Sequence, residues 1–125
     1  MLGDNPIYPV LLAEDLAAAR RFYHDPVGLE ILQENEAAIA FRCGETQLAV
    51  TQSTTGTADE QTQASWRVQD VRASVADLRS RGVTIEEYDM PGLKTEDGIA
   101  DLGFAWAAWI VDPGKNALGI LQLKG

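Results

Sequence analysis

The sequence has few of the residues on which many kinds of site depend. Its 125 residues include one cysteine, Cys43, and one histidine, His24. A lone cysteine excludes an internal disulfide and fits a reducing compartment, so we expect a cytoplasmic protein. We interpret Cys43 as a structural thiol. His24 lies where a helix should end, and we interpret it as a cation favoured by the helix dipole rather than as a general base.

Long apolar runs are also missing. No segment reaches the ~18–20 apolar residues of a membrane-spanning helix, and residues 1–6 lack the basic and apolar regions of a signal peptide. There is no glycine-rich phosphate loop followed by Lys and Ser or Thr. About 46% of the residues are apolar, enough for the core of one compact domain without disulfides or metal. We expect a single domain over residues 1–125 and no membrane partner.

Basic residues are the scarcer charge. Ten Lys and Arg stand against nineteen Asp and Glu, which gives a formal net charge of −9. Nucleic-acid phosphates would be repelled, so we expect no nucleic-acid partner. The excess of acid is compatible with a cationic ligand, and equally with a surface that serves solubility.

A hairpin near the C-terminus is the clearest local pattern. The stretch Trp109–Leu123 predicts strand, turn and strand, with β-forming residues on both sides. The turn residues are Asp112, Pro113, Gly114, Lys115 and Asn116, in which Pro presets φ, Gly tolerates positive φ, and Asp and Asn bond their own backbone.

The rest of the chain is an internal repeat with a period of about 55 residues. Asp15 and Asp70 predict helix N-caps, and Gly28 and Gly82 predict the helix ends. Strands are predicted over residues 7–13, 28–32, 37–42 and 47–52, then over 64–68, 83–85 and the final hairpin, with a loop over 88–98. This gives a module over about 5–53, a linker over 54–61 and a second module over 62–125.

Each module reads strand, helix and three strands, so the predicted fold class is α+β. Two βαβββ modules can curl their sheets into a cupped mixed sheet with the helices outside. A crevice between modules is where small ligands bind by default.

Three stretches resemble a known family. They are Val10–Leu16 with Arg21–Tyr23 and Gly28–Leu29; Trp66–Val71 with Leu78 and Gly82–Val83; and Asp112, Pro113 and Asn116. They are similar to the glyoxalase/bleomycin-resistance/extradiol-dioxygenase group, the vicinal oxygen chelate superfamily. The resemblance implies the cupped fold described above and a homodimer.

The resemblance also implies where a metal would bind. In metal-dependent members, His, Glu or Gln from the first and last strand of each module hold a divalent ion. Carried over to this chain, those positions are Tyr8, Ala49, Gln63 and Gly119, and none is His or Glu. Because an ion needs three or more side-chain ligands, we predict no metal and no cofactor. The superfamily's metal-dependent reactions would lose their Lewis acid.

Strand alternation, anchored on those positions, predicts the residues that face the cup. The predicted ligand-binding residues are Tyr8, Val10, Ala49, Gln63, Ser65, Arg67, Trp109 and Gly119. Trp66 falls on the opposite face under the second helix. Trp106 and Trp109 have opposite parity, and we favour Trp109 as the one that faces the cup. Arg67 either binds a ligand carboxylate or enolate, or forms an internal salt bridge. Tyr88 and the loop that follows it could form a lid, or a plain surface loop.

Three functions remain open at this stage. The leading hypothesis is a metal-free protein that sequesters a small aromatic or cationic compound, similar to the bleomycin-resistance branch. The alternative is a glyoxalase-like lyase or isomerase, or a dioxygenase-related enzyme, with a non-standard active site; whether the protein is an enzyme is left undecided. The third is a non-catalytic partner module.

Overall fold

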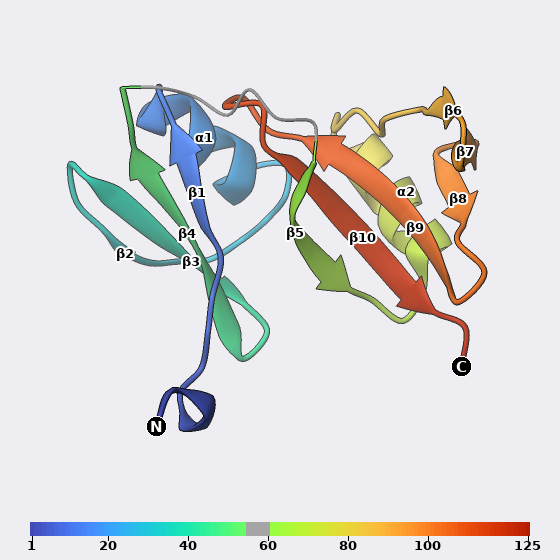
Figure 1. The fold of residues 1–125 in the computed structure, drawn as a ribbon. Coiled ribbons are helices and arrows are strands. Elements are labelled where there is room, and N and C mark those ends of the chain that lie inside the picture. The colour runs from blue at the N-terminus through green and yellow to red at the C-terminus, as the bar shows by residue number, and fades with distance from the viewer. Residues whose placement is uncertain (55–60) are drawn as a thin grey trace. The chain divides into compact units, whose positions relative to one another are not determined.

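A computed structural model of the chain describes residues 1–54 and 61–125 (Figure 1). The chain forms two compact units. The first unit holds the N-terminal half of the chain together with Pro113–Asn116, and the second holds the remainder of the C-terminal half. The linker predicted over 54–61 falls mainly on residues 55–60, outside the described residues.

The first unit is a helix on a four-stranded mixed sheet. Its elements are a 3-10 turn η1 (Leu2–Asp4), β1 (Val10–Ala13), α1 (Leu16–His24), β2 (Ile31–Glu34), β3 (Ala38–Cys43) and β4 (Thr46–Gln52). The strand order is β1-β4-β3-β2, with β1 parallel to β4 and the other neighbours antiparallel. β1 is an edge strand, and Pro9, which directly precedes it and cannot donate to a ladder, is compatible with that position.

Helix α1 begins where the sequence predicts. The Asp15 carboxylate accepts a hydrogen bond from the backbone N–H of Ala18 at 3.0 Å, which satisfies one free donor of the first turn. The helix buries Ala19 and Tyr23, and the Tyr23 ring lies 5.5 Å from that of Phe41 on β3. The core of this unit therefore lies between α1 and one face of the sheet.

The predicted Asp-Pro-x-x-Asn turn is confirmed. Lys115 has a φ of 67°, the left-handed conformation that such a turn requires. The Asn116 side chain is 1% exposed, and its Nδ2 donates to the carbonyl of Leu12 at 2.9 Å, within the first unit. Asn116 thus satisfies a main-chain acceptor near the end of β1.

The second unit repeats the strand–helix start and then extends it. Its elements are β5 (Thr62–Arg67), α2 (Val71–Ser80), β6 (Asp89–Met90), β7 (Leu93–Glu96), β8 (Ile99–Asp101), β9 (Ala105–Val111) and β10 (Ala117–Leu123). They form a mixed sheet of order β5-β10-β9-β8-β7-β6, in which only β5 and β10 are parallel. Asp70 caps α2 by accepting from the N–H of Ala73 at 3.1 Å.

Several predicted boundaries were wrong, and one predicted loop is a hairpin. The strand expected over 28–32 begins at Ile31, and residues 83–85 form no strand. Residues 88–98, expected to be a loop, contain β6 and β7. The Thr95 hydroxyl accepts from the backbone N–H of Tyr88 at 2.8 Å and Gly92 turns with a φ of 82°. These contacts, rather than β-propensity, set the hairpin.

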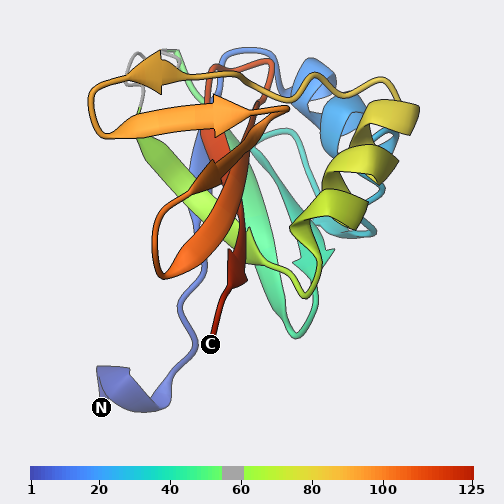
Figure 2. The same ribbon diagram turned by 90° about the vertical axis from the view of Figure 1, so that its right-hand side faces the viewer.

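The α+β fold class is confirmed by two helices and two mixed sheets among the described residues. In the second unit, Figure 2 shows the β6–β7 hairpin on the side of the sheet away from α2. Within residues 1–54 and 61–125, neither α1 nor α2 is long and apolar enough to cross a membrane.

Candidate ligand-binding site

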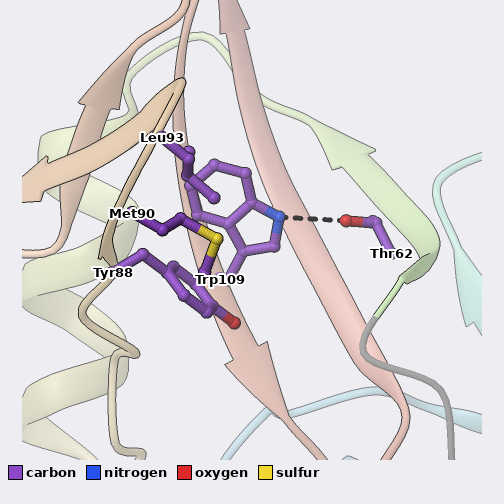
Figure 3. A pocket seen from close by; sticks show the side chains of 5 residues that line it. All are labelled: Thr62, Tyr88, Met90, Leu93 and Trp109. Carbon is purple, nitrogen blue, oxygen red and sulfur yellow. Dashed lines mark hydrogen bonds between the residues drawn. The ribbon is translucent and has the colours of Figure 1, made fainter.

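A pocket lies entirely within the second unit (Figure 3). Its volume is about 170 Å³. The lining residues come from both edges of the sheet and from its centre: Thr62, Tyr88, Met90, Leu93 and Trp109. Two aromatic rings, a thioether and an aliphatic side chain make this lining mostly apolar, as is usual for pockets that bind small organic molecules.

The indole of Trp109 extends across the neighbouring strand, β10. Trp109 on β9 is in register with Gly119 on β10. Its Nε1 donates to the hydroxyl of Thr62 at 3.1 Å, and Thr62 lies on β5, beyond β10 (Figure 3). Gly119, the residue of β10 in register with Trp109, has no side chain. The hydrogen bond to Thr62 fixes where the indole lies.

Tyr88 holds Trp109 from the hairpin side. The two rings meet edge to face, with centroids 5.5 Å apart and planes at 89°, a favourable aromatic geometry. The Tyr88 backbone is bound to Thr95, as described above, so the position of the ring is set by the β7 strand. Figure 3 shows the Met90 sulfur directed toward the indole, and Met90 is itself partly exposed.

Ser65, Gly119 and Trp109 form one row across three strands. Gly119 is in register with Ser65 on one side and with Trp109 on the other. A Cβ at position 119 would lie 2.6 Å from the Ser65 Oγ, so the side chain of Ser65 already occupies the space beside the glycine. Across β5, β10 and β9, this row therefore presents the hydroxymethyl group of Ser65, no side chain at Gly119, and the indole of Trp109.

The polar residues Gln63 and Arg67 differ in their hydrogen-bond partners. Gln63 donates from Nε2 to the carbonyl of Gln61 at 3.1 Å, a local contact. Arg67 is exposed, and it has no hydrogen-bond or ion-pair partner among residues 1–54 and 61–125. The internal salt bridge considered for Arg67 is therefore not formed with any described residue.

The eight predicted ligand-binding residues divide between the units. Tyr8, Val10 and Ala49 belong to the first unit, where Val10 and Ala49 are parallel neighbours and Tyr8 precedes β1. The other five belong to the second unit, and of these only Trp109 lines the pocket. Whether the eight bind a ligand stays a prediction.

Thr62, Met90 and Leu93 were not predicted from the sequence, and Tyr88 was considered only as part of a lid. A register shift between Ala117 and Leu118 pairs Thr62, not Gln63, with Ala117, which brings Thr62 to the pocket face. Strict alternation from Ser65 cannot reveal such a bulge. The alternation of Tyr88 and Met90 before Gly92, with Leu93 after it, was the available signal for the hairpin.

Trp66 and Trp106 lie on the face that α2 covers. Trp66 is in register with the buried Ile120. Trp106 is in register with Gln122, whose Oε1 accepts from the backbone N–H of Val71 at the start of α2 at 2.9 Å. The parity argument that separated Trp109 from these two tryptophans agrees with these contacts.

The charged groups with shifted pKa values lie outside the pocket. The Arg20 guanidinium, by its hydrogen bond, lowers the pKa of Glu34 in the first unit. Lys124, and then the N–H of Gly103, lower the pKa of Asp101 in the second. No residue of the pocket lining is a carboxylate, histidine or cysteine, the usual acids, bases and nucleophiles of catalysis.

The residues at the family's metal positions do not fit a divalent ion. Ala49 and Gly119 carry no donor atom, and the Gln63 amide donates to Gln61. Among the described residues, no three His, Cys, Asp or Glu side chains are grouped as a metal would require. The donor set thus offers no basis for a metal-borne step.

A family model, "Glyoxalase/Bleomycin resistance protein/Dioxygenase superfamily", matches residues 7–116. The chain belongs to this superfamily. The match spans β1 to the turn before β10, so it includes both units and confirms the resemblance seen in the sequence. Comparison with curated proteins found no match.

Solved structures of the superfamily share the fold. A bleomycin-binding protein from Streptomyces verticillus, complexed with copper(II)-bleomycin, has a TM-score of 0.74 at 22% identity over 93% of each chain. A superfamily protein from Alicyclobacillus acidocaldarius has a TM-score of 0.73 at 16% identity, covering 98% of this chain and 93% of its own. A lactoylglutathione lyase from Agrobacterium tumefaciens has a TM-score of 0.65 at 21% identity, and the match covers 94% of this chain and 92% of the lyase chain.

Proposed function

We propose that this protein binds a small aromatic compound in the pocket of the second unit and sequesters it without chemical change. The observation that carries this is the lining itself: Trp109 and Tyr88 with Met90 and Leu93, one threonine hydroxyl, and no carboxylate, histidine or cysteine. A structural neighbour is a bleomycin-binding protein, which supports ligand binding as one use of this fold.

The lining favours an aromatic ligand over a cationic one. Aromatic faces can attract a cation, but a buried cation is held best by a carboxylate, and the lining contains none. Aromatic rings gain by contact with indole, phenol and thioether groups. The lyase alternative would need a metal or an acid–base pair, and the pocket lining supports neither.

The pocket is the size of one ring. Drug-sized ligands occupy pockets of roughly 300–1,000 Å³, whereas an engineered cavity of about 150 Å³ binds benzene. The volume here, about 170 Å³, therefore suits one aromatic ring of a ligand. The rest of a larger ligand would extend over the sheet.

The test is a titration with a neutral aromatic probe, biphenyl-4-carboxamide, followed by tryptophan fluorescence and by calorimetry. The wild-type protein should bind the probe, and Trp109→Ala should weaken binding at least about tenfold, or 1.4 kcal/mol. Trp66→Phe, on the face that α2 covers, is the matched control and should bind normally. Unchanged binding in Trp109→Ala, or no binding by the wild-type protein, would contradict the proposal.

We also propose that the protein is a homodimer. The first unit exposes a series of apolar side chains before and along β1, among them Leu2, Ile7 and Val10. Burying these apolar side chains between two copies of the chain would remove them from water, which is favourable. Light scattering should give a molar mass of two chains for the wild-type protein. Ile7→Glu should lower that mass to the mass of a single chain. A single-chain mass for the wild-type protein at all concentrations would show that the dimer does not form.

A further inference from the structure

Arg67 stands on the same face of the second unit as the pocket. It follows Ser65 by two residues on β5, so both side chains leave the same side of the sheet. Ser65 is in register with Gly119, and Gly119 with Trp109. From strand spacing and rise, the Cα of Arg67 lies about 12 Å from that of Trp109.

Among the described residues, no large side chain projects from the sheet surface between Arg67 and the Trp109 indole. The Trp109 indole itself extends across β10 to Thr62, and the next side chain of that row toward Arg67 is Ser65, a small residue whose hydroxyl packs against Gly119. Next to Arg67, in register, is the partly buried Leu121. A flat ligand with one ring in the pocket could therefore extend along the sheet toward the guanidinium without displacing a large side chain.

The charge of Arg67 is not neutralised by any described residue. Carboxylates outnumber basic side chains in this sequence, 19 to 10. Ion pairs with carboxylates hold other arginines of the chain: Arg20, Arg42, Arg79 and Arg81. Arg67 is exposed, and its planar fork of donors is suited to bind both oxygens of a carboxylate.

We propose that Arg67 is a specificity-determining residue that binds an oxyanion, a carboxylate in the simplest case, on the ligand whose ring enters the Trp109 pocket. This rests on the proposed function. It makes the preferred ligand an aromatic carboxylate and gives the site two parts: an apolar end that takes the ring and a cationic end that selects the charge.

The experiment compares two probes of nearly equal shape, biphenyl-4-carboxylate and biphenyl-4-carboxamide, by calorimetry. The wild-type protein should bind the carboxylate about tenfold more tightly than the amide, and added salt should reduce this preference. Arg67→Gln should remove the preference by weakening carboxylate binding about tenfold, with a much smaller effect on the amide. Arg67→Lys, which keeps the charge but loses the planar fork, should retain part of it. Arg72→Gln, an exposed arginine on α2, is the matched control and should keep the preference.

The outcomes separate this proposal from the proposed function. Equal binding of both probes by the wild-type protein, with Trp109→Ala weakening both, would overturn the role of Arg67 and leave the pocket intact. An equal loss of both probes in Arg67→Gln would also overturn it, because the residue would not recognise the charge. If the wild-type protein binds neither probe, both proposals fail.

Discussion

The two units start alike and end differently. Each begins with a strand parallel to its last strand, followed by a helix capped by aspartate, Asp15 in one and Asp70 in the other. After α1 the first unit goes directly to three antiparallel strands. After α2 the second has five strands, two more than the first, and Tyr88, Met90 and Leu93 of the added β6–β7 segment line the pocket. The pocket of the second unit therefore combines this added segment with Thr62 and Trp109 of the shared frame.

The largest effect should separate the core of the first unit from the surface of the second. Phe41 is fully buried against Tyr23, whereas Phe104 is 64% exposed. Phe41→Ala should cost about 3–5 kcal/mol of unfolding free energy, and Phe104→Ala less than about 0.5 kcal/mol. Urea denaturation followed by circular dichroism measures both. Similar losses in the two variants would contradict the assignment of the core.

The helix caps test what the units share. Asp15→Ala and Asp70→Ala should each cost about 1 kcal/mol, because each leaves an N–H of the first helical turn without its acceptor. Asp→Asn at either position should retain most of the stability, since the amide oxygen still accepts. Thermal unfolding compares the four variants. A loss of unfolding free energy at only one of the two caps would show that the caps do not contribute equally to stability.

Position 119 tests a difference between the units, since the resemblance pairs it with Ala49 in the first. Gly119→Ala should cost about 1 kcal/mol, because the one close contact of the new Cβ is with the Ser65 hydroxyl, which can rotate, while the Ser65 Cβ and the Thr62 Cγ2 lie at 3.4 and 3.5 Å. Ser65→Ala should abolish that cost in the double variant. Ala49→Gly should destabilise by about 0.5–1 kcal/mol through backbone entropy. Stability curves of these variants measure the effects, and a Gly119→Ala cost unaffected by Ser65→Ala would contradict this contact.

The smallest effect concerns one carboxylate in each unit. The pKa of Glu34, beside Arg20, and that of Asp101, beside Lys124, are lowered in the folded state. Their stabilisation is therefore complete above the unfolded-state pKa values of about 4 and is lost as the pH falls through the folded ones. Both groups are exposed, so the contribution to stability is small.

Carboxyl titration by NMR can distinguish the two. Arg20→Met should return the pKa of Glu34 close to its ordinary value. Lys124→Met should raise the pKa of Asp101 only in part, because the N–H of Gly103 still donates to that carboxylate at 2.9 Å. Full recovery in both variants would show that the backbone contact adds nothing.

Local chemistry made part of the fold predictable. Asp15 and Asp70 act through the helix-capping contacts that their residue type predicts, and the structure confirms both. The turn at Asn116 was also predicted, but the hydrogen bond from its side chain to the distant Leu12 carbonyl was not. The β6–β7 hairpin was missed because its short strands depend on the Thr95 side chain binding the Tyr88 backbone, a contact that leaves no periodic pattern.

The candidate site was predictable to a smaller extent. Parity placed Trp109 correctly because β9 is regular over its length. Thr62 was missed because the bulge in the β5–β10 pairing breaks the alternation on which the assignment depended. Met90 and Leu93 lie on the hairpin itself, so their place in the pocket could not be seen before the hairpin was.

The three tryptophans, Trp66, Trp106 and Trp109, all belong to the second unit, while the aromatic residues of the first are tyrosine and phenylalanine. Indole emission during denaturation therefore follows one half of the molecule, whereas far-ultraviolet circular dichroism follows both. If the two melting curves coincide, the halves unfold in a single all-or-none transition. If they separate, an intermediate exists in which one half has lost its structure before the other.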